Sequence, residues 1–355
     1  MKAVILAAGQ GTRLRPVTYT MPKPLVPVAN KWLIAYAIDT LKAAGLTQIA
    51  IVVSSMDSPI VDTLGAGDVL GVEISYIVQE EQLGLAHAIG MAKDFVDDEP
   101  FCVFLGDNIF QDKMHDLLVN FPSTGYAAQI VLGEVPDPTR FGIAIIEEGR
   151  IKGVVEKPKD PPSNLAIAGV YLFQPTIFEA ITKIKPSWRN EYEITDAIQV
   201  LIDENQAVVP YALEGWWIDA GKPDPIVVAN QLVLEELPYS EADMDKIEGS
   251  SDVGHRVVIG ENSRIVDSVV RGPVIIGDNT TIKNSYIGPY TAIGNDTTVE
   301  DSEVEFSIVM NNCEILNVSG RIDRSLIAHN ARVTGSGLRP GTRRLVLAEN
   351  SLAEI

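Results

Sequence analysis

The chain has 355 residues, 46% of them hydrophobic and 21% charged, a composition typical of a soluble protein with a full hydrophobic core. Its length is sufficient for two domains. The formal net charge of −20 argues against a nucleic-acid partner, because binding to phosphates requires basic patches. The two cysteines, Cys102 and Cys313, indicate neither a disulfide framework nor a metal site. No segment approaches the roughly 18 apolar residues of a membrane span, so we expect a cytoplasmic protein without a membrane partner.

The first thirty residues combine a short apolar strand, a glycine-rich turn and two cations. A strand predicted at 2–7 leads directly into residues 9–13, and Lys23 follows between two prolines. Glycines allow backbone N–H groups to approach an anion, while Arg13 and Lys23 can neutralise its charge. The turn lacks the Gly-Lys-Ser/Thr of a Walker loop and the third glycine of a dinucleotide-binding loop. It therefore predicts a phosphate-binding loop of another kind, although a plain strand-to-loop turn would share the short glycine pattern.

Residues 1–238 alternate between β-rich runs and helical periods. This alternation predicts an α/β domain with a Rossmann-like mixed, mainly parallel sheet and helices on both faces. Ligands bind such sheets at the carboxyl ends of the strands, where the glycine turn lies. The predicted strands are 2–7, 49–54, 73–78 and 101–106, with a longer β-rich stretch at 126–173. The predicted helices are 32–44, with an Asn30 cap and Gly45 as terminator, then 85–95, 175–183, 195–205 and 223–237.

The sequence changes character after residue 238. Residues 239–251 are polar and acidic and predict a linker. A 17-residue repeat follows, with aliphatic residues six, six and five positions apart and a glycine after the first isoleucine of each unit. This spacing predicts that residues 252–355 form a left-handed parallel β-helix with a C-terminal tail, whose coils bury their aliphatic side chains by stacking. The three clear units begin at Ile259, Ile276 and Ile293, and the fourth is degenerate.

Several polar residues lie at the predicted ends of strands. Asp107 follows an apolar strand, and Asp219 stands in a short apolar segment before a glycine. Two converging carboxylates would suit Mg²⁺, which keeps waters and shares phosphate oxygens. Lys157 would hold a second phosphate, and Gln79 with Gly84 would read the edge of a base. The sequence permits this convergence without requiring it, because an isolated Asp107 is more often a turn or cap residue and Lys157 is as often an exposed strand-end charge.

The motifs follow one another in a specific order along the whole chain. They are G-x-G-T-R, P-K-P, Gly106-Asp107-Asn108, Glu156-Lys157-Pro158, the segment 189–196 and Trp217-x-Asp219-x-Gly221. With this series the chain resembles the sugar-1-phosphate nucleotidylyltransferases, and most of all the long form of the glucose-1-phosphate thymidylyltransferases. The resemblance implies that dTTP and glucose 1-phosphate condense to dTDP-glucose and pyrophosphate, with Mg²⁺ as the cofactor. It also implies a homo-oligomer.

The resemblance further implies a role for individual residues. The nucleotide would contact Leu6, Ala8, Gly9, Gly11, Gln79 and Gly84. Arg13, Lys23 and Lys157 would be the catalytic cations, Arg13 chiefly at the departing pyrophosphate. Asp107 and Asp219 would hold Mg²⁺. The sugar phosphate would contact Asn108, Gly142, Glu156, Lys157, Ile167 and Arg189, with Lys157 and Arg189 at the 1-phosphate.

The charges of the two substrates favour an in-line displacement. An ionised sugar phosphate oxygen attacks the α-phosphorus, so the reaction needs no general base, and the cations offset the repulsion between two anions. Ala8 and Pro24 depart from the common family pattern in ways that also occur among uridylyl relatives. UTP is therefore an alternative nucleotide.

Two other functions are compatible with parts of the sequence. One is a bifunctional enzyme whose β-helix transfers an acetyl group, for which His255 or His329 would have to act as a base. The other is a non-catalytic sugar-nucleotide sensor, a degenerate copy of the same fold. The presence of Arg13, Lys157, Asp107 and Asp219 disfavours the sensor, and an oligomerisation role for the β-helix is favoured over acetyl transfer.

Overall fold

The computed structural model describes residues 1–335 and 350–353, so most of the expected C-terminal tail lies outside the described residues. The chain divides into two compact units. The first comprises Met1–Gln10, Pro22–Leu25 and Leu33–Asp219, and the second comprises Gly11–Met21, Val26–Trp32 and Ala220–Ile355. Two N-terminal segments thus cluster with the C-terminal half, which differs from the contiguous division at residues 238 and 252 that the sequence led us to expect. Each unit is described by itself below.

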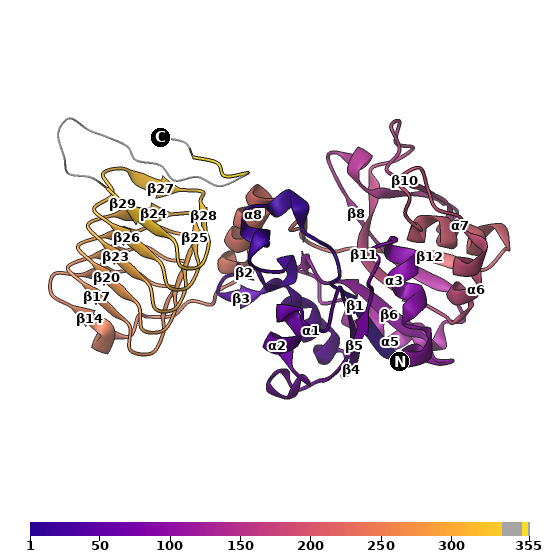
Figure 1. The fold of residues 1–355 in the computed structure, drawn as a ribbon, viewed down its shortest axis with the longest axis horizontal. Helices are drawn as coiled ribbons and strands as arrows, with labels where there is room; N and C mark the ends of the chain where they lie inside the picture. The colour runs from indigo at the N-terminus through magenta and orange to yellow at the C-terminus, as the bar shows by residue number, and fades with distance from the viewer. Residues whose placement is uncertain (336–349, 354–355) are drawn as a thin grey trace. The chain divides into compact units, whose positions relative to one another are not determined.

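The first unit is built around a nine-stranded sheet (Figure 1). Its strands are β1 (Lys2–Leu6), β4 (Gln48–Val53), β5 (Glu73–Val78), β6 (Phe101–Leu105), β8 (Ala128–Glu134), β9 (Gly142–Glu147), β10 (Arg150–Glu156), β11 (Leu165–Phe173) and β12 (Val208–Ala212). The order is β10-β9-β11-β6-β1-β4-β5, and β8 pairs with both β11 and β12. β1, β4, β5 and β6 are parallel, whereas β11 is antiparallel to β6, β8 and β9. The predicted Rossmann-like mixed sheet is confirmed.

Helices cover both faces of this sheet. They are α1 (Leu33–Ala43), α2 (Pro59–Leu64), α3 (Leu85–Met91), α4 (Lys93–Val96), α5 (His115–Asn120), α6 (Thr176–Lys183) and α7 (Ile194–Asp203). On one face, Ile89 of α3 and Phe178 of α6 belong to the same buried cluster as Val4 of β1. On the other, Ile34 of α1 and Ile5 of β1 both lie beside Gly106. Adjacent strand residues point to opposite faces, so Val4 and Ile5 serve the two layers. The predicted 85–95 helix is interrupted at Ala92, between α3 and α4.

A hairpin, not an N-cap residue, precedes α1. β2 (Pro27–Val28) and β3 (Lys31–Trp32) pair across Ala29 and Asn30, whose φ angles are 48° and 59°. Two consecutive positive φ values produce the tight turn that matches the twist of a hairpin, and asparagine tolerates this conformation. The prediction that Asn30 caps α1 is therefore wrong. Instead, the side-chain Nδ2 of Asn30 donates to the carbonyl of Ile293 at 2.7 Å. Gly45, with φ of 80°, ends the helix as predicted.

The second unit contains α8 (Pro223–Glu235) and three parallel sheets (Figure 1). The first sheet is β14 (Ile247–Glu248), β17 (Arg264–Val266), β20 (Thr281–Lys283), β23 (Thr298–Glu300), β26 (Glu314–Leu316) and β29 (Arg332–Thr334). The second is β15 (Asp252–Val253), β18 (Val269–Val270), β21 (Tyr286–Ile287), β24 (Glu303–Glu305) and β27 (Arg321–Asp323). The third is β16 (Val257–Ile259), β19 (Val274–Ile276), β22 (Thr291–Ile293), β25 (Ile308–Val309) and β28 (Leu326–Ile327). These are the three faces of the predicted left-handed β-helix.

The repeat sets the register and the core of the β-helix. Ile265 pairs with Ile282, which is 282 − 265 = 17 residues on, and Ile282 pairs with Val299. The nine aliphatic positions of the three clear units are all buried in one cluster: Ile259, Ile265, Val270, Ile276, Ile282, Ile287, Ile293, Val299 and Val304. β14 already pairs with β17, so the first coil begins inside the segment 239–251 that was expected to be a linker. Among the described residues, no helix is long and apolar enough to cross a membrane.

Candidate active site

One lysine in the first unit contacts two carboxylates. Lys23 lies in a short 3₁₀ helix, Lys23–Leu25, and is 7% exposed. Its ammonium forms a short ion pair with Asp107 Oδ2 and lies 3.5 Å from Asp219 Oδ1. The convergence of these carboxylates, which the sequence only permitted, is therefore present. A buried ammonium needs such partners, because an unpaired charge in the interior is costly.

Strand pairing explains why these distant residues meet. Asp107 follows β6 and precedes β7 (Asn108–Phe110), which pairs antiparallel with β13 (Trp217–Asp219). In this register Asp219 stands opposite Asn108, the neighbour of Asp107. Gly106 lies close against β1, because a Cβ there would be only 3.2 Å from the carbonyl oxygen of Leu6. The ribbon β7–β13 thus brings two carboxylates from distant parts of the sequence to one lysine.

Asn108 is held by a partner on each side of its amide. Its Nδ2 donates to Asp107 Oδ1 at 2.9 Å, and its Oδ1 accepts from Trp217 Nε1 at 2.6 Å. Asn108 is only 3% exposed. The Trp217 ring is nearly parallel to Phe110 and meets Phe141 edge-on. Trp217 is therefore a supporting residue that the sequence motif contained but to which we had assigned no role.

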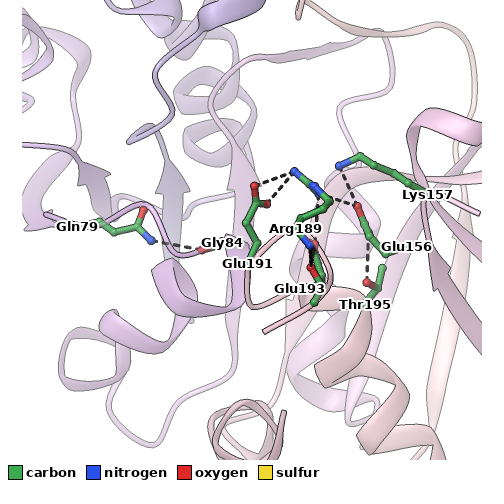
Figure 2. Close-up of polar contacts among 9 residues, drawn as sticks. Gln79, Gly84, Glu156, Lys157, Arg189, Glu191, Glu193 and Thr195 are labelled. Atoms are coloured by element: carbon green, nitrogen blue, oxygen red, sulfur yellow. Dashed lines mark hydrogen bonds and ion pairs between the residues drawn. The ribbon is translucent and has the colours of Figure 1, made fainter. Parts of the chain in front are cut away.

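A second charged cluster surrounds Glu156 (Figure 2). Glu156 Oε1 lies 3.0 Å from Lys157 Nζ and 3.6 Å from Arg189 Nη1. Its Oε2 accepts from Thr195 Oγ1 at 3.2 Å. Lys157 has a φ of 42°, so the chain turns sharply where β10 ends. Glu156, Lys157 and Arg189, which the sequence assigned to the sugar phosphate, are therefore close together.

Glycines bring the other predicted sugar-binding residues to this cluster. A Cβ on Gly142 would lie 3.2 Å from Glu156 Oε2 and 3.3 Å from Ile167 Cδ1. A Cβ on Gly169, in the same strand as Ile167, would lie 3.3 Å from Asn108 Nδ2. Gly169 has a φ of 81°, and the pairing of β11 with β8 shifts in this region. Strand β11 therefore connects Asn108 with the Glu156 cluster, and Gly169 is a contact that the sequence analysis did not identify.

Gln79 and Gly84 lie together in the loop between β5 and α3. Gln79 is 3% exposed and donates from Nε2 to the carbonyl of Gly84 at 3.3 Å. Its Nε2 also lies 2.9 Å from His87 Nδ1. Gly84 has a φ of 110°, and a Cβ there would lie 2.5 Å from the carbonyl oxygen of Tyr192. Only glycine fits this position, and Tyr192 ties the loop to the segment that carries Arg189, because its backbone N–H donates to the carbonyl of Leu83 at 2.7 Å.

The glycine turn extends over parts of both units. Leu6 ends β1, and Ala8 is 7% exposed, while Gly9 has open space around it. Gly11, with φ of 61°, precedes a 3₁₀ helix at Thr12–Leu14 in which Arg13 is exposed. Because residues 11–21 belong to the second unit, the position of Arg13 relative to Lys23 stays a prediction.

The acidic groups near Glu156 have perturbed pKa values. Burial raises the pKa of the Glu193 carboxyl; the hydrogen bond from Ser187 and the charge of Arg189 oppose this rise, and the charges of Glu156 and Glu191 add to it. Burial, with a contribution from the charge of Glu156, also raises the pKa of Asp196. Several carboxylates thus lie close together here, and burial affects Glu193 and Asp196.

Comparison with known proteins assigns the chain to one family. Residues 2–236 match the nucleotidyl transferase family, so the chain belongs to it and is an enzyme of that class. Over 99% of both chains it is 46% identical to a low-salt glycan biosynthesis nucleotidyltransferase of Haloferax volcanii.

Two further relatives are enzymes named for a sugar phosphate or a nucleotide sugar. The chain is 43% identical to a glucose-1-phosphate thymidylyltransferase of Streptomyces griseus, over 100% of this chain and 99% of the relative. The solved structure of a UDP-glucose pyrophosphorylase with UDP-glucose covers 66% of this chain and 98% of its own, with a TM-score of 0.58 and 29% identity. The predicted resemblance to sugar-1-phosphate nucleotidylyltransferases is thereby confirmed.

Proposed function

We propose that the protein condenses dTTP with glucose 1-phosphate to form dTDP-glucose and pyrophosphate. One observation carries the proposal: a buried lysine ammonium contacts two carboxylates that come from distant segments. Asn108, which the family resemblance assigns to the sugar phosphate, donates from Nδ2 to Oδ1 of Asp107 at 2.9 Å. The similarity to a thymidylyltransferase over the full chain supports dTTP and glucose 1-phosphate as the substrates.

The proposed chemistry depends on positioning and charge. The sugar phosphate oxygen is already ionised, so it attacks the α-phosphorus without a base, and pyrophosphate leaves in line. Lys157 and Arg189 would hold the attacking phosphate, and Lys23 with Arg13 would neutralise the triphosphate. Asn108, Gly142, Glu156 and Ile167 would contact the sugar, and the Leu6–Gly11 backbone with Gln79 and Gly84 would surround the base.

The carboxylate pair fits a divalent cation. A single cationic group, the Lys23 ammonium, already reaches both Asp107 and Asp219. Carboxylate oxygens are the ligands that Mg²⁺ prefers, and this ion commonly takes one or two carboxylates and completes its shell with waters and phosphate oxygens. Residues 1–335 and 350–353 contain no group of three or more His, Cys, Asp or Glu that could hold a metal. When bound, Mg²⁺ would neutralise charge on the phosphate oxygens.

UTP is the second candidate nucleotide. Ala8 and Pro24 depart from the common family pattern in ways that also occur among uridylyl relatives. The solved structure named above contains UDP-glucose. A thymine pocket differs from a uracil pocket by the space for one methyl group, which is worth only about 1–3 kcal/mol. The choice between the two nucleotides therefore requires a measurement of rates.

A pyrophosphate-release panel tests both substrates. Five nucleoside triphosphates are crossed with the 1-phosphates of glucose, galactose, mannose and N-acetylglucosamine, in the presence of Mg²⁺. We expect the highest kcat/KM for dTTP with glucose 1-phosphate. A higher value for UTP would favour the uridylyltransferase alternative, and absence of pyrophosphate with every pair would refute the proposal.

The β-helix is proposed to act in assembly rather than in catalysis. His329 is the residue of the repeat that an acetyl transfer would need as a base. Its Nδ1 accepts the backbone N–H of Asn311 at 3.0 Å, and burial lowers its pKa. His255 lies beside the Tyr239 ring, with its Nε2 3.2 Å from the phenolic oxygen. Both histidines thus have structural partners.

A further inference from the structure

One guanidinium in the first unit lies among three carboxylates. Arg189 Nη2 is 2.8 Å from Glu191 Oε2, and Nη1 is 3.3 Å from Glu193 Oε1 and 3.6 Å from Glu156 Oε1. Figure 2 shows the carboxylates on different sides of the guanidinium, with the Lys157 ammonium beside Glu156. Two cations thus face three carboxylates, so the cluster carries an excess of one negative charge.

The carboxylates on either side of Arg189 differ in burial. The Glu193 side chain is 4% exposed, whereas that of Glu191 is 34% exposed. A buried carboxylate cannot exchange its partner for water without a large cost, but a partly exposed one can. The Nη1 edge of Arg189 is therefore held by a fixed partner, and the Nη2 edge by a partner that can leave.

Ser187 forms hydrogen bonds with both Glu193 and the backbone of Arg189. The Ser187 hydroxyl donates to Glu193 Oε1 at 2.9 Å and accepts the backbone N–H of Arg189 at 3.1 Å. It therefore connects the buried carboxylate to the main chain of the arginine that this carboxylate contacts. Glu193 is the last residue before α7, so this assembly is anchored at the start of a helix.

The excess of negative charge in this cluster would repel the phosphate of a sugar 1-phosphate. Its phosphate brings up to two further negative charges to a cluster that is already negative. Binding at Arg189 therefore requires one carboxylate to withdraw. The partner with the lowest cost of withdrawal is Glu191, because it is the most exposed of the three. A phosphate in its place keeps charge-assisted hydrogen bonds to the guanidinium.

We propose that Glu193 is a positioning residue that holds Arg189 ready for the sugar 1-phosphate, and that Glu191 occupies the phosphate-binding edge of Arg189 until the substrate displaces it. The inference rests on the proposed function, because it takes Arg189 as a ligand of the 1-phosphate. Glu193 then strengthens substrate binding, and Glu191 weakens it by competition. The same substitution at the two positions has opposite effects.

The test compares Glu193→Gln with Glu191→Gln, which change the same chemical group on the same arginine. Pyrophosphate release is measured with varied glucose 1-phosphate at saturating dTTP, and then with the roles reversed. We expect Glu193→Gln to raise the KM for glucose 1-phosphate about tenfold, the size of one lost charged hydrogen bond. We expect Glu191→Gln to lower that KM severalfold. The KM for dTTP should change less than about twofold in both variants, because neither group contacts the nucleotide in the proposed arrangement.

Two outcomes would overturn the inference while the proposed function stands. If both variants raise the KM for glucose 1-phosphate, Glu191 is a substrate contact and not a competitor. If neither changes it while the wild type turns over, neither residue acts on the phosphate through Arg189. Absence of turnover in the wild type with every sugar 1-phosphate would overturn the proposed function as well, and is therefore distinguishable from both.

A third variant covers the case in which Glu193→Gln does not fold. Ser187→Ala removes the hydroxyl that joins Glu193 to the Arg189 backbone and leaves both charges in place. It should raise the KM for glucose 1-phosphate about threefold, in the direction opposite to Glu191→Gln. Thermal unfolding of each variant separates this effect from a general loss of structure. An unchanged KM in folded Ser187→Ala protein would contradict the positioning role.

Discussion

At the scale of single residues, the site is a set of charges that hold one another in place. Lys23 is buried, and its ammonium contacts Asp107 and Asp219. Asn108, beside Asp107, is fixed through its amide by Trp217. Such prearranged charges favour catalysis because little reorganisation is needed when charge develops in the transition state.

The substitution Asp107→Asn tests the proposed role of this carboxylate. The amide removes the negative charge that would bind Mg²⁺, so turnover should fall on the order of 10³-fold, as when a transition-state charge is lost in other phosphoryl transfers. Folding should be retained, because the amide oxygen can still accept from Lys23. Pyrophosphate release and thermal unfolding measure the two effects. Asp98→Asn, at an exposed position, is the matched control.

Arg13→Ala is expected to abolish most turnover in the same assay, again without loss of the fold. Arg13 is exposed in a 3₁₀ helix, so its removal leaves no cavity. Near-normal pyrophosphate release from either Arg13→Ala or Asp107→Asn would contradict the roles proposed for them.

At the scale of elements, the β-helix depends on residues that occur once in each coil. A Cβ on Gly260, Gly277 or Gly294 would collide with the backbone of the next coil. Corner positions have positive φ and carry Asn or Asp, as at Asn262 and Asn279, which tolerate this conformation. The stacked amides also bond to one another, with Asn262 Nδ2 3.2 Å from Asn279 Oδ1. The repeat that is visible in the sequence is therefore a consequence of close stacking.

The substitution Gly277→Ala should destabilise the β-helix. Its Cβ would lie 2.7 Å from the carbonyl carbon of Gly294, and both belong to backbone that has little room to move. Overpacking of this kind costs about 1–3 kcal/mol. Gly320→Ala is the control in the same domain, because nothing lies within 4 Å of a Cβ there. Urea unfolding followed by circular dichroism compares the two, and equal stabilities would contradict the stacking argument.

At the scale of the whole molecule, the second unit joins segments from both ends of the sequence. Asn230 of α8 is fully buried. Its Oδ1 accepts the backbone N–H of Ala29 at 2.8 Å, and its Nδ2 donates to the carbonyl of Tyr290 at 2.9 Å. The hairpin β2–β3, α8 and a coil of the β-helix thus meet at one side chain. These contacts explain why residues 26–32 cluster with the C-terminal half.

The substitution Asn230→Ala should destabilise this junction. It leaves the buried N–H of Ala29 and the partly buried carbonyl of Tyr290 without this partner, at about 1–3 kcal/mol for the buried group and less for the other. Gln231→Ala, the next residue of the same helix, is the matched control, and alanine there favours the helix. Urea unfolding gives the difference in free energy. Equal stabilities of the two variants would show that the junction adds nothing to the fold.

Short-range sequence patterns were sufficient to predict much of the secondary structure and the β-helix. Six-residue spacing predicted the β-helix, because each coil repeats the same local contacts and one aliphatic residue per face determines the register. Apolar runs predicted strands β1, β4, β5 and β6 to within one residue at each end, but not the short hairpin strands β2 and β3. The motifs predicted candidate site residues, and the structure brings Lys23, Asp107 and Asp219 together. The prediction of an Asn30 cap was wrong because asparagine is common both in hairpin turns and at helix starts. Only the pairing of β2 with β3 distinguished the two.

The tertiary structure decided which residues meet. Lys23 and Asp219 are separated by 196 positions, and their approach depends on the pairing of β7 with β13. The approach of Glu156 to Arg189 and the junction at Asn230 likewise arise from packing, whereas Glu191 and Glu193 lie within four residues of Arg189 in the sequence. The physical reason is that periodicity encodes which face of an element is buried, whereas the contacts of a site depend on how several buried faces fit together.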